Sequence, residues 1–471
     1  MARKNKRIVF EGVEIIDAGA KGKGIAKAPD GRIIFVDDVI PGDVADLQTY
    51  KKRKAYYHAK PIRFHQYSNK RIPLEEQNKD YSGVAPWQNM QYEHQLLYKQ
   101  KEVENNLRRL GNLELPEISP IIGSKATHYY RNKMEYTFSN KRWFTEEEIN
   151  STQNFDHLNQ NALGFHVPGM WDKVINIKEC HLQKEPSNAI RNAIREFALK
   201  NDLSFFDLKK QEGFLRTLMI RTSTTNDLMV LVQFFYEDSA KRELLLDFIG
   251  NKFPEITSLL YVINSKGNET IYDQEVLCYK GKDHIYEEME GLRFKIDAKS
   301  FYQTNSEQAY QLYKVAREFA DISPQDIVYD LYTGTGTIAQ FVAKKAQKVV
   351  GIEAVPEAIQ AAKENAKQNK ITNTVFYAGD MRKILTDAFI LKNGAPDIVI
   401  TDPPRNGMHK DVVNQLLKVR PRRIVYVSCN SATQARDLAL LDEVYAIKKV
   451  QPVDMFPQTY HIENVVCLEE R

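Results

Sequence analysis

The sequence is poor in cysteine. Its four cysteines stand at positions 180, 278, 429 and 467, and no two of them have the C-x-x-C spacing of a metal site. So few cysteines at such wide spacing exclude a disulfide framework and a zinc cage, and leave reactivity as one reason to keep a thiol. From this cysteine pattern we expect no metal. The chain also lacks any run of the ~20 apolar residues that a membrane helix needs, so we expect no membrane partner.

Net positive charge is small, but it is concentrated at one end of the chain. The net charge is +4, whereas residues 1–70 carry 15 Lys or Arg against 8 Asp or Glu. The basic run at 51–54 lies beside Tyr56, Tyr57 and His58, an interleaving that suits a nucleic-acid backbone with unstacked bases. A solvated strand edge would show the same run. Because acidic residues rather than an apolar segment follow the basic start, we expect a cytoplasmic protein without a secretory signal.

The chain of 471 residues is longer than one hydrophobic core usually serves, so we expect two or three domains. Residues 1–62 contain short strands between Gly- and Pro-containing turns, which predict a small β-barrel of the OB type. Residues 63–295 hold a linker, a helix that stops at Gly111 and a mixed region, and predict a central α+β domain. Alternating strands and helices in residues 296–471 predict a parallel Rossmann-like sheet, so the fold class is α/β.

A glycine-bearing turn follows the first strand of this last domain. Gly334, Gly336 and Ala339 fit the G-x-G-x-x-A pattern, and Glu353 follows at the end of the next strand, where it could take a ribose diol. The pattern alone is weak. A nicotinamide enzyme, a methyltransferase that uses S-adenosylmethionine and a turn without a ligand all fit it.

Further strands place more chemistry at the same edge. Asp380, Asp402 and Cys429 each end a predicted strand, and ligands of open α/β sheets bind outside the carboxyl ends of the strands. The last two strands are joined by MFPQTY, which is too short for a parallel crossover, so they must run antiparallel. The final strand then begins at this edge and brings His461 and Glu463 to the rim that holds Cys429.

A cysteine at a strand end is usually a small buried apolar residue. Here its neighbours favour a reactive thiol instead. Arg405, in the loop after the strand that ends at Asp402, could favour the thiolate, and Pro403 and Pro404 stiffen that loop.

Five stretches in this order resemble the RNA uracil-C5 methyltransferase family. They are FYQTNSEQ (301–308), DLYTGTGT (330–337), TDPPRNG (401–407), VSCNSATQARDL (427–438) and DMFPQTYHIENV (454–465). The N-terminal segment is similar to the TRAM module of many members. The resemblance implies a class I methyltransferase that uses S-adenosylmethionine to methylate RNA.

The resemblance also implies roles for individual residues. Cys429 would add to C6 of uracil, which activates C5 as a nucleophile, and Glu463 would be the base that removes the C5 proton. The residues that would contact the methyl donor are Gln303, Tyr332, Glu353 and Asp402. Gly334 and Gly336 would let the backbone close around it. Two further candidates for contacts with the donor are Thr337 and Asp380.

Two departures from the family pattern stand out. Many members bind an iron–sulfur cluster through three spaced cysteines and a later one, but the spaced positions fall on Glu76, Ser82 and Ala85, which leaves only Cys180. We therefore expect no iron–sulfur cluster. Ser431 replaces a proline that is common after the Cys-Asn pair, and this change could loosen the loop without removing the thiol.

The expected substrate is structured RNA, because a uracil must leave its stack to meet such a pocket. Relatives use transfer RNA and large-subunit ribosomal RNA; the TRAM-like module favours 23S ribosomal RNA, and we expect a monomer. Two alternatives stay open. RNA cytosine-C5 methyltransferases usually place a cysteine after the proline pair, where this chain has Arg405, and a non-catalytic RNA-binding or assembly factor could retain the fold.

Overall fold

The computed structural model describes residues 7–73, 85–144, 146–151 and 158–471. The chain divides into two compact units. The first unit comprises Met1–Thr127, Lys314–Asp321 and Asp397–Arg471, and the second comprises His128–Tyr313 and Ile322–Pro396. This grouping cuts across the three predicted segments, since the last predicted domain contributes to both units; the boundaries at 62 and 295 stay a prediction.

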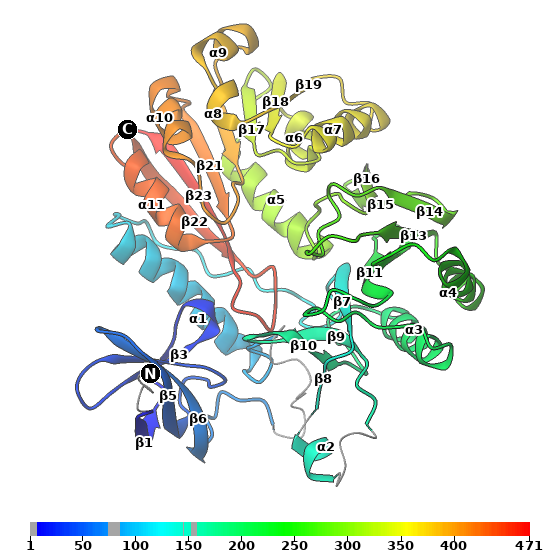
Figure 1. The fold of residues 1–471 in the computed structure, drawn as a ribbon. Helices are drawn as coiled ribbons and strands as arrows, with labels where there is room; N and C mark the ends of the chain where they lie inside the picture. The colour runs from blue at the N-terminus through cyan, green and yellow to red at the C-terminus, as the bar shows by residue number, and fades with distance from the viewer. Residues whose placement is uncertain (1–6, 74–84, 145, 152–157) are drawn as a thin grey trace. The chain divides into compact units, whose positions relative to one another are not determined.

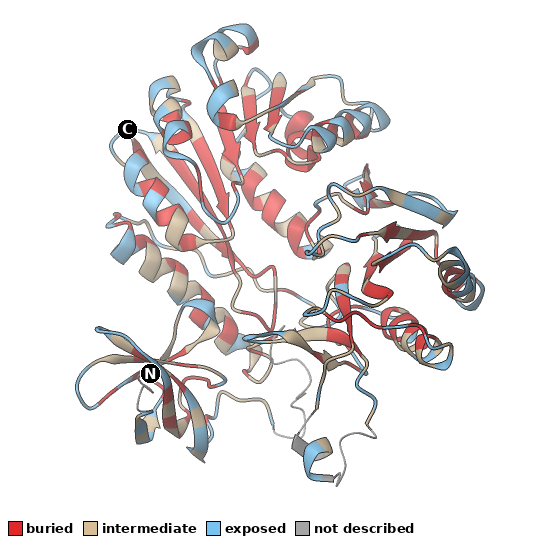
Figure 2. Cartoon of the chain, in the orientation of Figure 1, coloured by how far each residue is buried: buried red, intermediate tan, exposed pale blue. Residues whose placement is uncertain are grey.

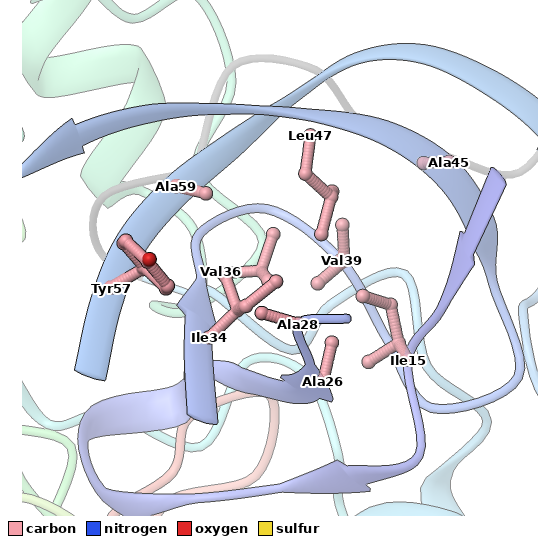
Figure 3. Close-up of a cluster of buried hydrophobic side chains, with 10 residues drawn as sticks. All are labelled: Ile15, Ala26, Ala28, Ile34, Val36, Val39, Ala45, Leu47, Tyr57 and Ala59. Atoms are coloured by element: carbon pink, nitrogen blue, oxygen red, sulfur yellow. The ribbon is translucent and has the colours of Figure 1, made fainter. Parts of the chain in front are cut away.

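The N-terminal strands of the first unit form one curved sheet. The strands are β1 (Val9–Glu14), β2 (Asp17–Ala18), β3 (Gly24–Lys27), β4 (Ile33–Val36), β5 (Val44–Lys52) and β6 (Tyr56–Gln66). Their order in the sheet is β1-β5-β6-β4-β3-β2. Alternate side chains of β4, β5 and β6 are buried, as expected for strands with one face on a core. Figure 3 shows Leu47 of β5 and Ile34 of β4 in this core, together with Ile15, which follows β1.

The sequence pattern predicts one strand over residues 43–62, and the structure has two strands there instead. A turn closed by the bond from Arg53 N–H to the carbonyl of Tyr56 (2.8 Å) separates β5 from β6, and β6 continues to Gln66. The two strands then pair antiparallel. The sequence does not predict this turn, because it consists of Lys, Arg and Ala and contains neither Gly nor Pro. β-Branched and aromatic residues on both sides favour a continuous strand.

The predicted helix before Gly111 is confirmed. α1 covers Tyr92–Asn105 and a wider helical turn, η4, continues over Asn106–Leu110. The helix buries Gln95, Tyr98, Lys99 and Val103 on one side. The helix ends at Gly111, where there is no room for a side chain. A Cβ on Gly111 would lie 2.7 Å from Cδ1 of Leu113 and 2.8 Å from the carbonyl oxygen of Leu107.

The remaining strands of the first unit are β20 (Ile398–Thr401), β21 (Arg423–Ser428), β22 (Tyr445–Val453) and β23 (Glu463–Glu470). They lie in the order β20-β21-β23-β22, with β20 and β21 parallel. β23 runs antiparallel to both β21 and β22, which confirms the direction predicted from the short MFPQTY loop. α10 (Lys410–Val419) and α11 (Ser431–Leu441) connect these strands.

The second unit contains an eight-stranded sheet and a hairpin. The strands of the sheet are β7 (Lys133–Ser139), β8 (Arg142–Trp143), β9 (Ala162–Val167), β10 (Met170–Asn176), β11 (Leu215–Thr222), β12 (Leu228–Phe234), β13 (Ser258–Ile263) and β14 (Val276–Gly281), in the order β14-β13-β12-β11-β7-β9-β10-β8. α2 (Glu146–Ser151), α3 (Ser187–Lys200) and α4 (Ser239–Lys252) accompany it, and β15 (His284–Met289) pairs with β16 (Leu292–Asp297).

Three parallel strands complete the second unit: β17 (Ile327–Leu331), β18 (Lys348–Glu353) and β19 (Thr374–Ala378), in the order β19-β18-β17. The helices of this region are α6 (Thr337–Ala343), α7 (Pro356–Gln368), α8 (Met381–Ile384), α9 (Asp387–Asn393) and the first part of α5 (Ser306–Ala320), whose residues from Lys314 onward belong to the first unit. The alternation of strand and helix follows the prediction (Figure 1). Buried residues gather in the strands of both units (Figure 2). No helix in the described parts of the chain is long and apolar enough to cross a membrane.

Candidate active site

Cys429 lies on the tight turn between β21 and α11. Asn430 caps the helix, since its side-chain oxygen accepts a hydrogen bond from Ala432 N–H (3.2 Å), and its own N–H donates to the hydroxyl of Ser428 (3.1 Å). These bonds fix the backbone on both sides of the half-buried thiol. The sulfur is therefore held by a rigid strand-to-helix connection rather than by a free loop.

The loop after β20 is fastened to this same turn. The carbonyl oxygen of Arg405 accepts hydrogen bonds from the Asn430 amide (3.0 Å) and from the Thr433 hydroxyl (3.0 Å). The guanidinium of Arg405 donates to Nδ1 of His461 at 2.6 Å. The structure thus brings together Arg405, Cys429 and His461, as the strand order predicted.

Asp437 anchors the far end of that loop. Its carboxylate accepts hydrogen bonds from the Tyr426 hydroxyl (2.7 Å) and from Met408 N–H (2.7 Å). Gly407 has φ +76°, and a Cβ there would lie 2.5 Å from Oδ2 of Asp437. Only glycine fits this close approach in that backbone conformation.

Two carboxylates share the neighbourhood of the thiol. Glu463 opens β23 and is buried, with only 4% of its surface exposed, while Asp402 follows β20 and is half-buried. Burial raises the pKa of Asp402 to about 7. Burial, and then the charge of Asp402, raise the pKa of Glu463 well above its usual range, against the opposing effect of Arg405. The two acids therefore compete for ionisation, and the pair retains a proton near neutral pH.

The thiol itself is mostly protonated at neutral pH. Burial first, then the charges of Glu463 and Asp402, raise the pKa of Cys429 to about 11. Arg405 lowers the pKa, both by its charge and by a hydrogen bond, but does not outweigh the other effects. Arg405 therefore favours the thiolate in the predicted direction, but burial and the two carboxylates have the larger effect on the pKa of the thiol.

Ser431, which stands where a proline is common in the family, makes a contact of its own. Ser431 is the first residue of α11 and is buried. Its hydroxyl accepts a hydrogen bond from the Asn106 amide at 2.8 Å. This bond ties the start of α11 to the end of α1, so the serine supplies a contact that a proline could not.

In the second unit, a buried aspartate shapes the glycine-bearing turn between β17 and α6. Asp330 accepts hydrogen bonds from the Thr333 hydroxyl and from Ala339 N–H (3.0 Å). Tyr332, Gly334 and Gly336 all have positive φ, of 64°, 55° and 77°. The backbone thus turns back sharply at the carboxyl end of β17, which is where such sheets bind ligands.

The two glycines of this turn have different surroundings. A Cβ on Gly336 would lie 2.9 Å from Cβ of Ala362 and 3.0 Å from the ring of Phe376, whereas a Cβ on Gly334 would meet nothing within 4 Å. Gly336 is needed for close packing, while Gly334 leaves open space beside its backbone. An open backbone at this position is what a small ligand needs for close approach.

Glu353 ends β18 and is held by the same turn. Its Oε2 accepts from Gly334 N–H (3.2 Å), and its Oε1 accepts from Ala354 N–H (2.7 Å) and Val355 N–H (3.0 Å). A carboxylate has about four acceptor positions, so these three bonds orient it and leave acceptor capacity for a hydroxyl of a ligand. The residues present therefore fit a ribose-bearing cofactor.

The other predicted cofactor residues lie in different surroundings. Gln303 is a buried residue of the segment that connects β16 to α5. Its backbone carbonyl oxygen accepts a hydrogen bond from the side-chain amide of Asn132 at 2.9 Å. Thr337 is buried at the start of α6. Asp380 caps α8 and is bound by the backbone and guanidinium of Arg382, which lowers the pKa of Asp380 to about 2. Asp380 is thus already engaged by a cation.

The positions that hold iron–sulfur ligands in relatives are partly outside the described residues. Glu76 and Ser82 lie there, while Ala85 and Cys180 are buried in the described part of the chain. Among the residues that the structure describes, no group of three His, Cys, Asp or Glu side chains could hold a metal ion.

The site can now be compared with known proteins. The family described as tRNA (Uracil-5-)-methyltransferase matches residues 265–471. An otherwise uncharacterized RNA methyltransferase of Bacteroides thetaiotaomicron is 57% identical over 96% of this chain and 100% of its own length. A second such protein, from Porphyromonas gingivalis, is 53% identical over 97% of this chain and 99% of its own length. The chain belongs to the RNA uracil-C5 methyltransferase family.

A solved structure agrees with this assignment. The tRNA (uracil-54, C5)-methyltransferase of Pyrococcus abyssi, in complex with S-adenosyl-L-homocysteine, is 27% identical, with a TM-score of 0.74 over 97% of this chain and 99% of its own. Three predictions from the sequence are thereby confirmed. They are the α/β fold with a class I methyltransferase domain, the enzyme class, and S-adenosylmethionine as the methyl donor.

Several residues that build the site were not singled out by sequence reasoning. Asp437 and Thr433 lie within the stretch 427–438, and Asp330 opens the stretch 330–337, but none of them was given a role. Asp437 and Thr433 bind backbone groups of Met408 and Arg405, which only the fold brings close, whereas Asp330 binds Thr333 and Ala339 within its own turn. The available signal was their place inside the family-like stretches.

Proposed function

We propose that the enzyme methylates C5 of a uridine in structured RNA through a transient bond between Cys429 and C6 of the base. The observation that carries this proposal is the cluster of one half-buried thiol, Arg405 and the paired acids Asp402 and Glu463 at one strand edge. An acid pair with raised pKa values beside a nucleophile is an arrangement typical of catalytic sites.

The chemistry follows from the poor nucleophilicity of uracil C5. The Cys429 thiol loses its proton to solvent as its sulfur adds to C6, which moves electrons toward C5 and makes that carbon reactive. C5 then bonds to the methyl group that S-adenosylmethionine supplies, and S-adenosylhomocysteine leaves. The Glu463 carboxylate then accepts the proton from C5, and the bond between sulfur and C6 breaks with return of the electron pair to sulfur. A base of raised pKa in a buried site is suited to this proton transfer.

The residues of the second unit are proposed to hold the methyl donor. Glu353 would accept hydroxyl groups of its ribose with the acceptor capacity described above, and Gly334 would allow its close approach. Gln303 and Tyr332 remain proposed contacts, as does Asp402, which belongs to the first unit. Gly336, Thr337 and Asp380 are proposed as supporting residues, since Gly336 and Thr337 are packed into the turn and Asp380 is engaged by Arg382.

The RNA target has two candidates. The TRAM-like barrel favours 23S ribosomal RNA, our first candidate. The neighbour from Pyrococcus abyssi acts on transfer RNA, and the match to it leaves out only 3% of this chain, so most of the barrel is included. The barrel therefore does not separate the two substrates, which keeps transfer RNA as the second candidate. A cytoplasmic monomer stays a prediction.

A trapping experiment tests the proposal. RNA that contains 5-fluorouridine cannot lose the C5 substituent as a proton, so wild-type enzyme with S-adenosylmethionine should form a stable covalent complex at Cys429. The Cys429→Ser variant should bind the RNA and form none. RNA binding without an adduct in the wild type would favour the assembly factor. Mapping of 5-methyluridine in ribosomal and transfer RNA from a strain without the enzyme would identify the target.

A further inference from the structure

The half-buried ring of Tyr460 lies against the N-terminal barrel, which is formed by β1 to β6 of the first unit. Between β2 and β3 the chain makes a short helical turn, η1 (Ala20–Gly22), and Gly22 has φ +72°. A Cβ on Gly22 would lie 2.9 Å from Cδ1 of Tyr460 and 3.4 Å from its Cβ. The backbone of the barrel is therefore packed directly against the side chain that precedes His461 in the sequence.

A hydrophobic cluster joins the barrel to this ring. It consists of side chains from the barrel, from α1 and from the segments that adjoin them: Ala18, Ile40, Trp87, Met90, Tyr98 and Tyr460. Trp87 also forms two hydrogen bonds across the junction. Its indole N–H donates to the carbonyl of Gly22 (3.3 Å), and its backbone N–H donates to the carbonyl of Gln458 (2.9 Å). The barrel is thus fastened to the segment that leads to His461.

The main chain on either side of Tyr460 is held by further hydrogen bonds. The buried Gln95 of α1 donates from its amide to Oε1 of Gln458 (2.8 Å) and accepts from the Gln458 N–H (2.8 Å). The hydroxyl of Thr459 accepts from the His461 N–H (3.1 Å). Because the main chain is fixed by these bonds, the place of the Tyr460 ring is decided by the groups that pack against it.

The ring of Tyr460 in turn contacts the ring of His461. The two ring centroids lie 4.3 Å apart, and their planes are inclined by 45°. Nδ1 of His461 accepts the hydrogen bond from the guanidinium of Arg405. Arg405 lowers the pKa of Cys429 by its charge and by a hydrogen bond. A chain of direct contacts therefore runs from the barrel to the thiol.

We propose that Tyr460 is a positioning residue, through which the N-terminal barrel holds the bonded side chains of His461 and Arg405 in place at the thiol. The barrel then contributes to the reactivity of Cys429 in the absence of RNA, apart from any contact that it makes with the substrate. The inference rests on the proposed function in that Cys429 is the nucleophile of the reaction. Side chains that are packed without free volume transmit a displacement to their neighbours, so a change of the barrel at Tyr460 shifts this arrangement.

Two glycines of the barrel form a matched pair for the test. Gly22 and Gly31 both have positive φ, of 72° and 81°, so an alanine causes similar backbone strain at either position. A methyl group at Gly31 would meet nothing within 4 Å, whereas one at Gly22 would press on the rings of Tyr460 and Trp87. A difference between Gly22→Ala and Gly31→Ala therefore reports packing against these rings rather than strain in the barrel.

The first measurement is the rate at which iodoacetamide alkylates Cys429 in the full-length enzyme at pH 8, without RNA or methyl donor. The exposed Cys278 is the internal reference. Gly22→Ala should slow the alkylation of Cys429 about threefold, because a displaced arginine stabilises the thiolate less, and Gly31→Ala should leave the rate unchanged. Tyr460→Ala should slow it by a similar factor, whereas Tyr460→Phe keeps the ring and should restore the wild-type rate.

A double variant tests whether the barrel acts through Tyr460. Once the tyrosine ring is removed, the methyl group at position 22 no longer presses on it, so Gly22→Ala/Tyr460→Ala should react at the rate of Tyr460→Ala. Multiplied effects in the double variant, equal rates in Gly22→Ala and Gly31→Ala, or a slow rate in Tyr460→Phe would each overturn the inference. If Gly22→Ala does not fold, the difference between Tyr460→Ala and Tyr460→Phe decides.

Steady-state kinetics separate this role from RNA binding. Loss of positioning in Gly22→Ala should lower kcat about threefold at an unchanged KM for RNA. A raised KM together with an unchanged alkylation rate would show a contact with RNA instead and would overturn the inference. Failure here is distinct from failure of the proposed function. The 5-fluorouridine adduct of the wild type reports whether Cys429 bonds to RNA, whereas alkylation without RNA reports only how the barrel affects the thiol.

Discussion

Arg405 donates a hydrogen bond to Nδ1 of His461 at 2.6 Å, and the same guanidinium lowers the pKa of Cys429 against the effects of burial and of Glu463. His461 can accept this bond only when Nδ1 carries no proton. The ring therefore accepts from the arginine and helps to hold its guanidinium in place. The backbone of Arg405 is independently held by Asn430 and Thr433.

We expect Arg405→Ala to make Cys429 less reactive. Loss of the positive charge raises the pKa of the thiol further, and one pKa unit corresponds to a tenfold smaller thiolate fraction at pH 8. Alkylation of Cys429 by iodoacetamide should therefore slow about tenfold, as measured by mass spectrometry. The exposed Cys278 serves as an internal reference whose rate should not change. The rate of Cys429 alkylation in Arg405→Lys should fall between the rates in the wild type and in Arg405→Ala. An unchanged Cys429 rate in Arg405→Ala would exclude the electrostatic role of Arg405.

Glu463→Gln should separate methyl transfer from product release. The amide fills the same buried volume but cannot accept the C5 proton, so the methylated adduct should persist and release should slow by about 100-fold or more. Gel electrophoresis of the protein–RNA complex with ordinary uridine RNA should show the adduct. The double variant Cys429→Ser/Glu463→Gln should show none. Normal turnover by Glu463→Gln would assign the base to another group.

Asp402→Asn should change how stability depends on pH. The native carboxyl keeps its proton up to a pKa of about 7, whereas in the unfolded chain it loses the proton near its usual value. Native protein thus binds more protons between about pH 4 and pH 7, and stability falls as pH rises through this window. The variant lacks this loss, so its stability relative to wild type should improve by about 1–3 kcal/mol from pH 4 to pH 8. Urea denaturation at several pH values measures the difference, and a constant offset would contradict it.

The sequence predicted the site well where strand direction decides the outcome. The short loop MFPQTY predicted that the last strand runs antiparallel to its neighbour. This direction brings Glu463 and His461 to the edge of the sheet that holds Cys429. The pKa of the thiol could not be predicted, because it depends on how far burial and two carboxylates outweigh one arginine. Those quantities arise from packing between strands that are distant in sequence. The split of β5 and β6 was missed because the turn consists of charged residues.

The two glycines of the cofactor turn allow a matched comparison. Gly336→Ala would place a methyl group 2.9 Å from Ala362 in a backbone of positive φ, so we expect a loss of stability of about 2 kcal/mol or more. Gly334→Ala adds a methyl in open space and should cost about 1 kcal/mol from its backbone conformation. Both should weaken binding of S-adenosylhomocysteine in calorimetry. If Gly334→Ala binds normally, close approach of the donor at this position is excluded.

A buried ion pair supports the loop that carries His461. Lys99 of α1 lies 2.5 Å from Oδ1 of Asp454, and its ammonium also donates to the carbonyl of Phe456 (3.0 Å). Tyr92 donates to the other oxygen of Asp454 at 2.8 Å. Both ions are fully buried, so their desolvation is offset only while they remain together.

Lys99→Met should destabilise the enzyme by about 3–5 kcal/mol, because it leaves the Asp454 carboxylate buried without its cation. Urea denaturation followed by tryptophan fluorescence measures this loss, since Trp87 is buried in the same unit and contributes to the signal. The double variant Lys99→Met/Asp454→Leu removes both charges and should be more stable than Lys99→Met alone. If the double variant is the less stable of the two, the contacts of Asp454 with Tyr92 and the loop backbone, rather than the ion pair, support this segment.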